Sequence, residues 1–298
     1  MSKSTIFLEA CNKVVGFEQM GEEFIRKLVI DGKSRSTHEN YLRQMSKLAL
    51  FYNLTPLQIG IGELEEYLYQ LIQNDSDSLS SFKHLVYGLR KLYNLFGKEE
   101  LQLALPSINR PNKLPVVLSK QEVKRLLRAP EHLSEKVMFG LTYDTGLRIN
   151  ELISLLIRDV HLDRGQVHIR QSKNKKDRYV TMSSHAVRGV KKHLTLNSPK
   201  TYLFESPKHK GMPMSNTYIR NLLKTIVEKA EISKDVCVHT LRHSYATHQL
   251  EAGQNIMVLK ESLGHANIQT TLIYLHIAQI DPAKRFGCME ILYEKGNG

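Results

Sequence analysis

The sequence predicts a mainly α-helical protein with one small β-hairpin, divided into two domains by a proline-rich linker. Most of the chain carries apolar residues at three- and four-residue spacing, which is the spacing of one helix face. One stretch near residue 170 changes to strict alternation, which is typical of strands. Prolines 106, 111 and 115 interrupt helix formation, because proline lacks the backbone N–H that a helix uses. Together these observations indicate an α+β protein.

Length and composition exclude several classes of protein. The chain has 298 residues and 41% hydrophobic residues, so it can bury real cores and is not a disordered chain. It lacks a run of about 18 apolar residues and its first residues do not resemble a signal peptide, so we expect a cytoplasmic protein without membrane contact. Three cysteines without CxxC spacing argue against a disulfide framework and a cysteine zinc site. A net charge of +12 favours a polyanionic partner, of which nucleic acid is the commonest.

Residues 1–105 are predicted to form a four-helix bundle, and residues 106–115 an extended basic linker. Glycine, proline and short polar runs separate the helical stretches. The four predicted helices are Phe17–Ile30, Ser34–Tyr52, Gly62–Gln73 and Ser78–Phe96.

Residues 116–298 are predicted to form the second domain. Ser119 and Glu122 have the spacing of a capping box and indicate a helix start. Gln166–Gln171 and Arg178–Met182 alternate around a lysine-rich turn, which predicts a β-hairpin. The remaining predicted helices are Ser134–Tyr143, Arg148–Leu156, Ser184–His193, Ser215–Ala230, Thr240–Glu251, Ile256–Leu263 and Ile268–Ala278.

An arginine and a glutamate stand at one of these helix starts, in the stretch TGLRINEL. Arg148 follows Gly146 where backbone N–H groups favour an anion. Glu151, three residues later, lies on the same side and can hold the guanidinium group. Taken alone, the pair also fits an ordinary surface salt bridge.

The hairpin turn SKNKKDR is strongly basic. Lys173, Lys175, Lys176 and Arg178 suit a finger laid on a DNA backbone, although lysines on a turn also fit a solvated tip. A lysine there can donate a proton to a departing oxygen if its pKa falls near neutrality.

The stretch HTLRH places His239, Arg242 and His243 on one predicted helix. A zinc site would need a glutamate where Thr240 stands and a third ligand. The group suits a phosphate better, because an arginine binds two oxygens in a fork while an imidazole moves a proton. A purely structural helix remains an alternative for this motif.

A glycine, a histidine and a tyrosine follow in LGHANIQTTLIYLH. Gly264 suits a left-handed helix cap, His265 lies in the turn, and Asn267 can cap a helix that carries Tyr274. A phenol ionises near pH 10 and is a weak nucleophile unless cations and a base assist it. Two arginines can neutralise the charge on a phosphate without a metal, so we expect neither metal nor cofactor.

These motifs together resemble the tyrosine recombinase family, also called the phage integrase family, over about residues 116–280. The front half resembles its core-binding domain. The resemblance rests on the order and spacing of five elements: Arg148 with Glu151, the hairpin lysine Lys173, the group His239, Arg242 and His243, then His265, and Tyr274.

The resemblance implies a role for each of these residues. Arg148 and Arg242 would hold the scissile phosphate, and Tyr274 would attack it to leave a 3′-phosphotyrosyl link and a 5′-hydroxyl. Lys173 would be the general acid, although Asn174-Lys175 stands where the family more often has Gly-Asn, so Lys175 is a rival. His239 and His265 would stabilise the transition state, with proton transfer most often given to the former, and Glu151 and His243 would support them.

The resemblance also implies an assembly. Two domains would close as a C-shaped clamp on double-stranded DNA with an inverted-repeat site. A homotetramer on two duplexes would exchange strands through a Holliday junction without ATP, aided by DNA-bending or directionality proteins. Residues 281–298 would pack on a neighbouring protomer. Two alternatives stay open: a type IB topoisomerase and a catalytically inactive DNA-binding protein.

Overall fold

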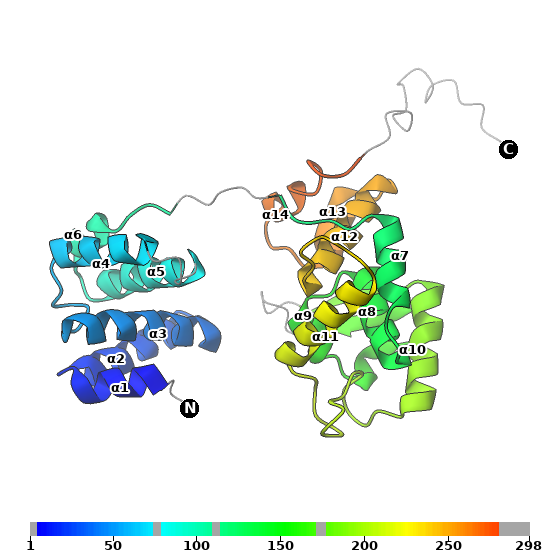
Figure 1. Cartoon of the computed structure of the whole chain (residues 1–298), viewed down its shortest axis with the longest axis horizontal. Helices are drawn as coiled ribbons and strands as arrows, with labels where there is room; N and C mark the ends of the chain where they lie inside the picture. Colours follow the sequence, from blue (N-terminus) through cyan, green and yellow to red (C-terminus); the bar gives the residue numbers. More distant parts are fainter. Residues whose placement is uncertain (1–4, 74–78, 109–113, 171–176, 280–298) are drawn as a thin grey trace, which may run out of the picture. The chain divides into compact units, whose positions relative to one another are not determined.

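The computed structural model describes residues 5–73, 79–108, 114–170 and 177–279 (Figure 1). The chain divides into two compact units at Pro111 and Asn112, and each unit has its own hydrophobic core. The turn with Lys173, Lys175 and Lys176 and the C-terminal segment 281–298 lie outside the described residues.

The described part of the first unit consists of six helices. These are α1 (Thr5–Lys13), α2 (Phe17–Ile30), α3 (Arg35–Tyr52), α4 (Ile61–Gln73), α5 (Leu79–Leu95) and α6 (Glu99–Ala104). Helices α2 to α5 match the four predicted helices, whereas α1 and α6 were not predicted. With nine and six residues, these two are too short to show a convincing helical period.

Helix α3 lies at the centre of the first unit and packs against α1 and α5. Met45 of α3, Leu89 of α5 and Phe24 of α2 are fully buried in the core. Gly88 allows α3 and α5 to approach closely, because a Cβ atom there would lie 3.1 Å from the Cβ atom of Tyr41. The fit between these helices is therefore a backbone contact as well as a side-chain one.

The second unit contains helices and a small sheet. Its elements are α7 (Lys120–Arg128), α8 (Leu133–Thr145), α9 (Ile149–Ile153), the 3₁₀ turn η1 (Ile157–Asp159), β1 (Val160–His161), β2 (Gln166–Ile169), β3 (Arg178–Thr181), α10 (Ser184–Asn197), α11 (Asn216–Lys229), α12 (Val238–Glu251), α13 (Ile256–Leu263) and α14 (Gln269–Leu272). The predicted fold class, mainly α with a small sheet, is confirmed.

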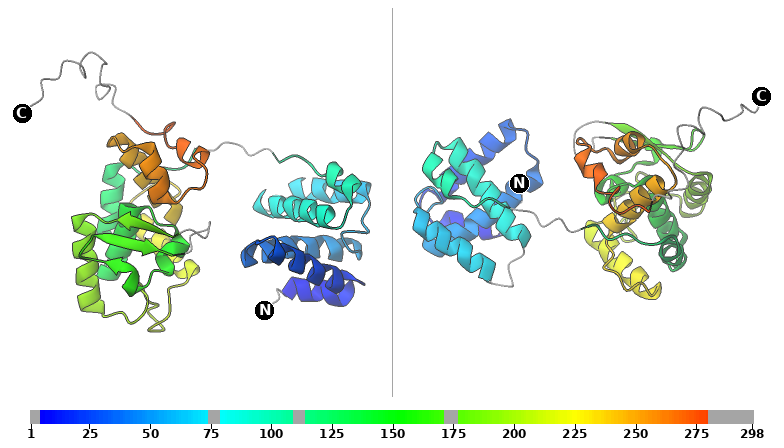
Figure 2. Two further views of the ribbon diagram at one scale, coloured as in Figure 1. Left: turned by 180° about the vertical axis from the view of Figure 1, so that it is seen from behind. Right: turned by 90° about the horizontal axis from the view of Figure 1, so that it is seen from above.

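The sheet is antiparallel in the order β1-β2-β3, and its strands are drawn as green arrows in Figure 2. The predicted hairpin pairs β2 with β3, with Val167 opposite Val180. The two-residue strand β1 was not predicted. Strand β3 packs against α13, so the base of the hairpin lies beside the helices that carry the later motifs.

Helix α12 runs through the interior of the second unit and packs against α8 and α13. Helix α8 ends at Thr145 and is capped by Gly146, whose φ of 63° is the left-handed conformation that favours glycine. A Cβ atom at Gly146 would lie 2.5 Å from the ring of Tyr245 in α12. The glycine therefore permits both the turn into α9 and the close packing of α12.

Two predicted helices are shorter than expected. The helix predicted over Ile268–Ala278 is the four-residue α14, and Tyr274 lies in the turns that follow it. Its β-branched residues disfavour a longer helix. Likewise α9 ends at Ile153 instead of Leu156, and the Ser154 hydroxyl after it donates to the carbonyl oxygen of Asn150 at 2.8 Å. Across the described ranges, none of the helices has the length and apolar character required to cross a membrane.

Candidate active site

The structure brings five of the predicted catalytic residues into one region of the second unit. Arg148 stands at the start of α9, while His239 and Arg242 come from α12. His265 lies in the turn between α13 and α14, and Tyr274 follows α14. The carbonyl oxygens of residues 263 and 264 accept hydrogen bonds from Arg242 and Arg148, so the end of α13 joins the two arginines.

Arg242 is almost completely buried, with 3% of its surface exposed. Its guanidinium group donates to the carbonyl oxygens of Gly146 and Leu263, both at 2.6 Å, and to Nε2 of His265 at 2.9 Å. Burial and the charge of Arg148 lower the pKa of Arg242 to about 10, so the group stays cationic at neutral pH. A guanidinium group has five N–H donors, so donors remain for an anion.

Glu151 connects two arginines. Its carboxylate accepts from Nη1 of Arg148 at 2.8 Å and from both terminal nitrogens of Arg178 at 3.0 and 2.8 Å. Burial opposes its ionisation, but the hydrogen bond and charge of Arg178, followed by those of Arg148, outweigh it and lower the pKa of Glu151 to about 2. The carboxylate therefore stays ionised and holds Arg148 in place.

Arg178 lies elsewhere than the hairpin motif suggested. The sequence predicts that it contacts DNA; in the structure its side chain is 10% exposed and bound to Glu151, and its Nε also donates to the carbonyl oxygen of Ser262 at 2.9 Å. The alternation of the strand could have indicated this inward position, because Arg178 shares a face with the buried Val180. Gly264 completes this contact, since a Cβ atom there would lie 2.9 Å from the Arg178 guanidinium group.

The hydroxyl of Tyr274 meets His243. Its oxygen lies 2.9 Å from Nδ1 of His243, and the tyrosine is 2% exposed. The ring packs in a small apolar cluster with Ala246, Leu259 and Leu263. The sequence placed His243 among the supporting residues without predicting that it contacts the phenol, because the pairing depends on how the turn after α14 folds back onto α12.

The site is electropositive, and its histidines are neutral at pH 7. Burial, together with Arg242 and Arg148, lowers the pKa of His239 and lowers that of His265 to about 3. Burial, His239 and Arg242 lower the pKa of His243 to about 4. Burial raises the pKa of Tyr274, and the two arginines oppose that rise. Three guanidinium groups and one carboxylate, Glu151, give a formal charge of 3 − 1 = +2, which favours an anion.

The zinc alternative for His239 and His243 finds no further ligand in the described part of the chain, which has no cluster of three or more His, Cys, Asp or Glu side chains placed for a metal ion. The two imidazole rings lie 6.3 Å apart between centroids in an edge-to-face arrangement, and His243 already contacts Tyr274.

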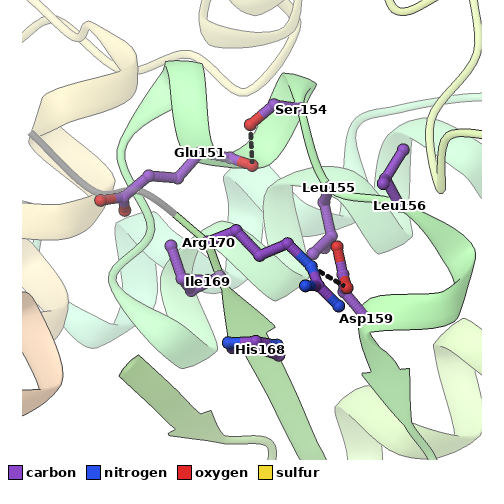
Figure 3. A pocket seen from close by; sticks show the side chains of 8 residues that line it. All are labelled: Glu151, Ser154, Leu155, Leu156, Asp159, His168, Ile169 and Arg170. Atoms are coloured by element: carbon purple, nitrogen blue, oxygen red, sulfur yellow. Dashed lines mark hydrogen bonds and ion pairs between the residues drawn. The ribbon is translucent and has the colours of Figure 1, made fainter. Parts of the chain in front are cut away.

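A separate hollow of about 330 Å³ lies on the other side of Glu151, between α9 and β2 (Figure 3). Its charged groups Asp159 and Arg170 pair with each other at 2.7 Å. Figure 3 shows the Glu151 carboxylate directed away from Arg170. Glu151 lines this hollow as well, while its carboxylate is bound to the arginines.

Comparison with known proteins agrees with this geometry. Residues 116–280 match the model of the phage integrase family, and residues 20–103 match the N-terminal SAM-like domain of phage integrases. The chain belongs to the phage integrase family. The resemblance inferred from the five motifs is thus confirmed.

Relatives of this family member are tyrosine recombinases. A tyrosine recombinase of Thermosipho africanus is 32% identical over 259 residues, covering 82% of this chain and 90% of the relative. Tyrosine recombinase XerA of Pyrococcus furiosus is 33% identical over 262 residues, covering 86% and 88%. These matches make the chain a tyrosine-type site-specific recombinase and do not favour the topoisomerase or the inactive DNA-binding alternative.

Solved structures share the fold. The crystal structure of XerA recombinase aligns with a TM-score of 0.53 at 28% identity, over 88% of this chain and 94% of that one. The Tn1549 transposon integrase in complex with circular intermediate DNA aligns with a TM-score of 0.67 at 16% identity, over 86% and 94%, which shows the fold alone.

Proposed function

We propose that Tyr274 is the nucleophile of this recombinase and that Arg148 and Arg242 bind the phosphodiester it attacks. One observation carries the proposal: the His265 ring stacks on the Tyr274 ring with centroids 6.5 Å apart, and its Nε2 accepts a hydrogen bond from Arg242 at 2.9 Å, so the tyrosine lies beside the arginines. A phosphodiester there would have its charge balanced by arginines, which are donors shaped for phosphate oxygens. This distinguishes Tyr274 from an ordinary core tyrosine.

The reaction exchanges one phosphate ester for another. The phenol oxygen forms a bond to phosphorus, the bond from phosphorus to the 5′ oxygen breaks, and a 3′-phosphotyrosyl link and a 5′-hydroxyl result. Lys173 supplies the proton to the departing oxygen, with Lys175 as the alternative. Neutral His239 and His265 stabilise the transition state with the arginines. No metal is required because the guanidinium groups balance the phosphate charge, and no ATP is required because the phosphotyrosyl link retains the ester bond energy.

The larger assembly is part of the same proposal. Residues 1–105 form the core-binding domain, 106–115 the linker and 116–298 the catalytic domain, and both domains bind double-stranded DNA in the cytoplasm. Lys175 and Lys176 contact the DNA backbone. A homotetramer holds two duplexes with inverted-repeat sites and proceeds through a Holliday junction, with residues 281–298 on a neighbouring protomer and accessory proteins setting direction. The solved structures of XerH recombinase bound to palindromic difH substrate support such a site, although they resemble this chain at 23% identity.

A suicide substrate tests the proposal. DNA nicked beside the scissile phosphate loses its short 5′-hydroxyl strand after cleavage, so the covalent protein–DNA adduct accumulates. We expect wild-type protein to form this adduct in EDTA, and Tyr274→Phe to form none while binding DNA equally well. Tyr179→Phe is the matched control, because Tyr179 is 57% exposed on the sheet. An adduct mapped to another residue, or relaxation of supercoiled DNA by a monomer without two-site recombination, would contradict the proposal.

A further inference from the structure

The contact between His243 and Tyr274 assigns a partner to the nucleophile. In the part of the chain that the structure describes, His243 is the histidine whose ring nitrogen lies within hydrogen-bond distance of the Tyr274 hydroxyl, at 2.9 Å. The tyrosine is almost completely shielded from solvent, so bulk water is poorly placed to receive its proton. A proton leaving the phenol has Nδ1 of His243 as its nearest acceptor.

The other two site histidines are less suited to this task. Nε2 of His265 accepts a hydrogen bond from Arg242 at 2.9 Å, and its Nδ1 lies 2.9 Å from the Thr271 hydroxyl, so both ring nitrogens are already occupied. The His265 ring stacks parallel to Tyr274 with centroids 6.5 Å apart, which supports the ring and not the oxygen. His239 lies one turn before His243 on α12, with the two ring centroids 6.3 Å apart, and it is Nδ1 of His243 that lies 2.9 Å from the phenol oxygen.

The ionisation states fit a proton acceptor. His243 is neutral because burial, His239 and Arg242 lower its pKa to about 4, and burial raises the pKa of Tyr274. A general base is most effective when its pKa lies near the working pH, so the base must become more basic when substrate binds. A bound phosphate also offsets the charge of Arg242, which makes His243 more basic when substrate is present.

We propose that His243 is a catalytic residue that holds the Tyr274 hydroxyl and accepts its proton through Nδ1 as the phenol oxygen attacks phosphorus. The inference rests on the proposed function, since it names the base for that nucleophile. The phenol O–H bond breaks as the oxygen–phosphorus bond forms, and the departing 5′ oxygen takes a different proton from the hairpin lysine. When the 5′-hydroxyl attacks in the rejoining step, protonated His243 returns its proton to the tyrosine oxygen.

A leaving-group substitution separates the base from the acid. In DNA with a 5′-bridging sulfur at the scissile phosphate, the leaving thiolate needs no proton. We expect His243→Asn to lower the single-turnover rate of adduct formation by at least about 100-fold on ordinary suicide substrate, and sulfur should not restore it. Lys173→Ala should be slow on the ordinary substrate and be restored by sulfur. His185→Asn, on an exposed site of α10, is the matched control and should behave as wild type.

The pH dependence distinguishes His243 from His239. The wild-type rate should fall with unit slope toward acid as the base becomes protonated, and this limb should vanish in His243→Asn but persist in His239→Asn. The reverse pattern, a near-wild-type rate for His243→Asn, or its rescue by sulfur would overturn the inference. His243→Gln, which also cannot take up a proton in this range, repeats the test if the asparagine variant folds poorly. If the wild-type protein forms no adduct at all, the proposed function itself is contradicted.

Discussion

Glu151 and Arg178 form a forked ion pair, with Nη1–Oε1 and Nη2–Oε2 distances of 3.0 and 2.8 Å, and the same carboxylate binds Arg148. Arg178, at the base of the hairpin, is thereby connected through one carboxylate to Arg148, the arginine proposed to bind phosphate. The pair links the start of β3 to the start of α9.

Removing the carboxylate should destabilise the second unit. Glu151→Gln leaves two partly buried guanidinium groups without their counter-ion, and breaking a fully buried ion pair costs about 3–5 kcal/mol, which is the upper limit here. Urea unfolding should therefore show a lower midpoint, and adduct formation should slow because Arg148 loses its support. Glu131→Gln, which breaks the exposed pair with Lys229, is the control and should leave the midpoint nearly unchanged. Equal midpoints for the two variants would contradict this role.

Arg178 and the turn lysines should respond differently to salt. Each lysine that contacts a DNA phosphate contributes about one counter-ion to the salt dependence of binding. Lys175→Ala and Lys176→Ala should each lower the slope of log K against log salt by about 0.9. Arg178→Ala should leave the slope unchanged and slow cleavage, because its guanidinium group binds Glu151. A smaller salt-dependence slope in Arg178→Ala would instead show that Arg178 contacts a DNA phosphate.

The free energy of unfolding of the second unit should begin to fall at a pH above that at which most carboxylates become protonated. The folded-state pKa values of His243 and His265, about 4 and about 3, lie below the ordinary value of 6.5. Such groups contribute stability that is fully present above pH 6.5 and is lost as the pH falls through the folded-state values. Glu151, lowered to about 2, adds a further loss below its ordinary pKa of 4.5.

Urea midpoints measured between pH 7.5 and 4 should therefore decline, and His265→Asn should decline less steeply than wild type. A flat profile over this range would show that these imidazoles do not titrate with folding.

Gly146 should tolerate no side chain. Alanine there would need a left-handed φ of 63° and would place its Cβ atom 2.5 Å from the Tyr245 ring, so we expect a loss of about 1–3 kcal/mol and a weakened hold on Arg242. Gly140 lies within α8, the helix that Gly146 caps, and has open space where a Cβ atom would be added. Gly140→Ala should therefore be neutral or stabilising by up to about 1 kcal/mol. Thermal unfolding of the two variants measures the difference, and a Gly146→Ala protein as stable as Gly140→Ala would contradict the packing argument.

Much of the fold was predictable because these elements depend on the spacing of apolar and polar residues within a short segment of the chain. The four long helices of the first unit, the hairpin pairing of β2 with β3, and the capping box of Ser119 and Glu122 depend on residues a few positions apart. The set Arg148, His239, Arg242, His265 and Tyr274 was also recognisable from spacing. Short helices such as α1 and α6 were missed, because so few residues do not show a clear helical spacing of apolar side chains.

The sequence by itself determined which side chains are present, their order, the helical segments and the family. Only the tertiary structure decided that Arg178 points inward to Glu151 and that Tyr274 lies beyond α14 with its hydroxyl on His243. The physical reason is distance along the chain: these contacts join residues 27 and 31 positions apart, whose meeting depends on how whole elements pack and turns close. Local spacing constrains neighbours within a turn or two, and the chemistry of this site lies in contacts between elements.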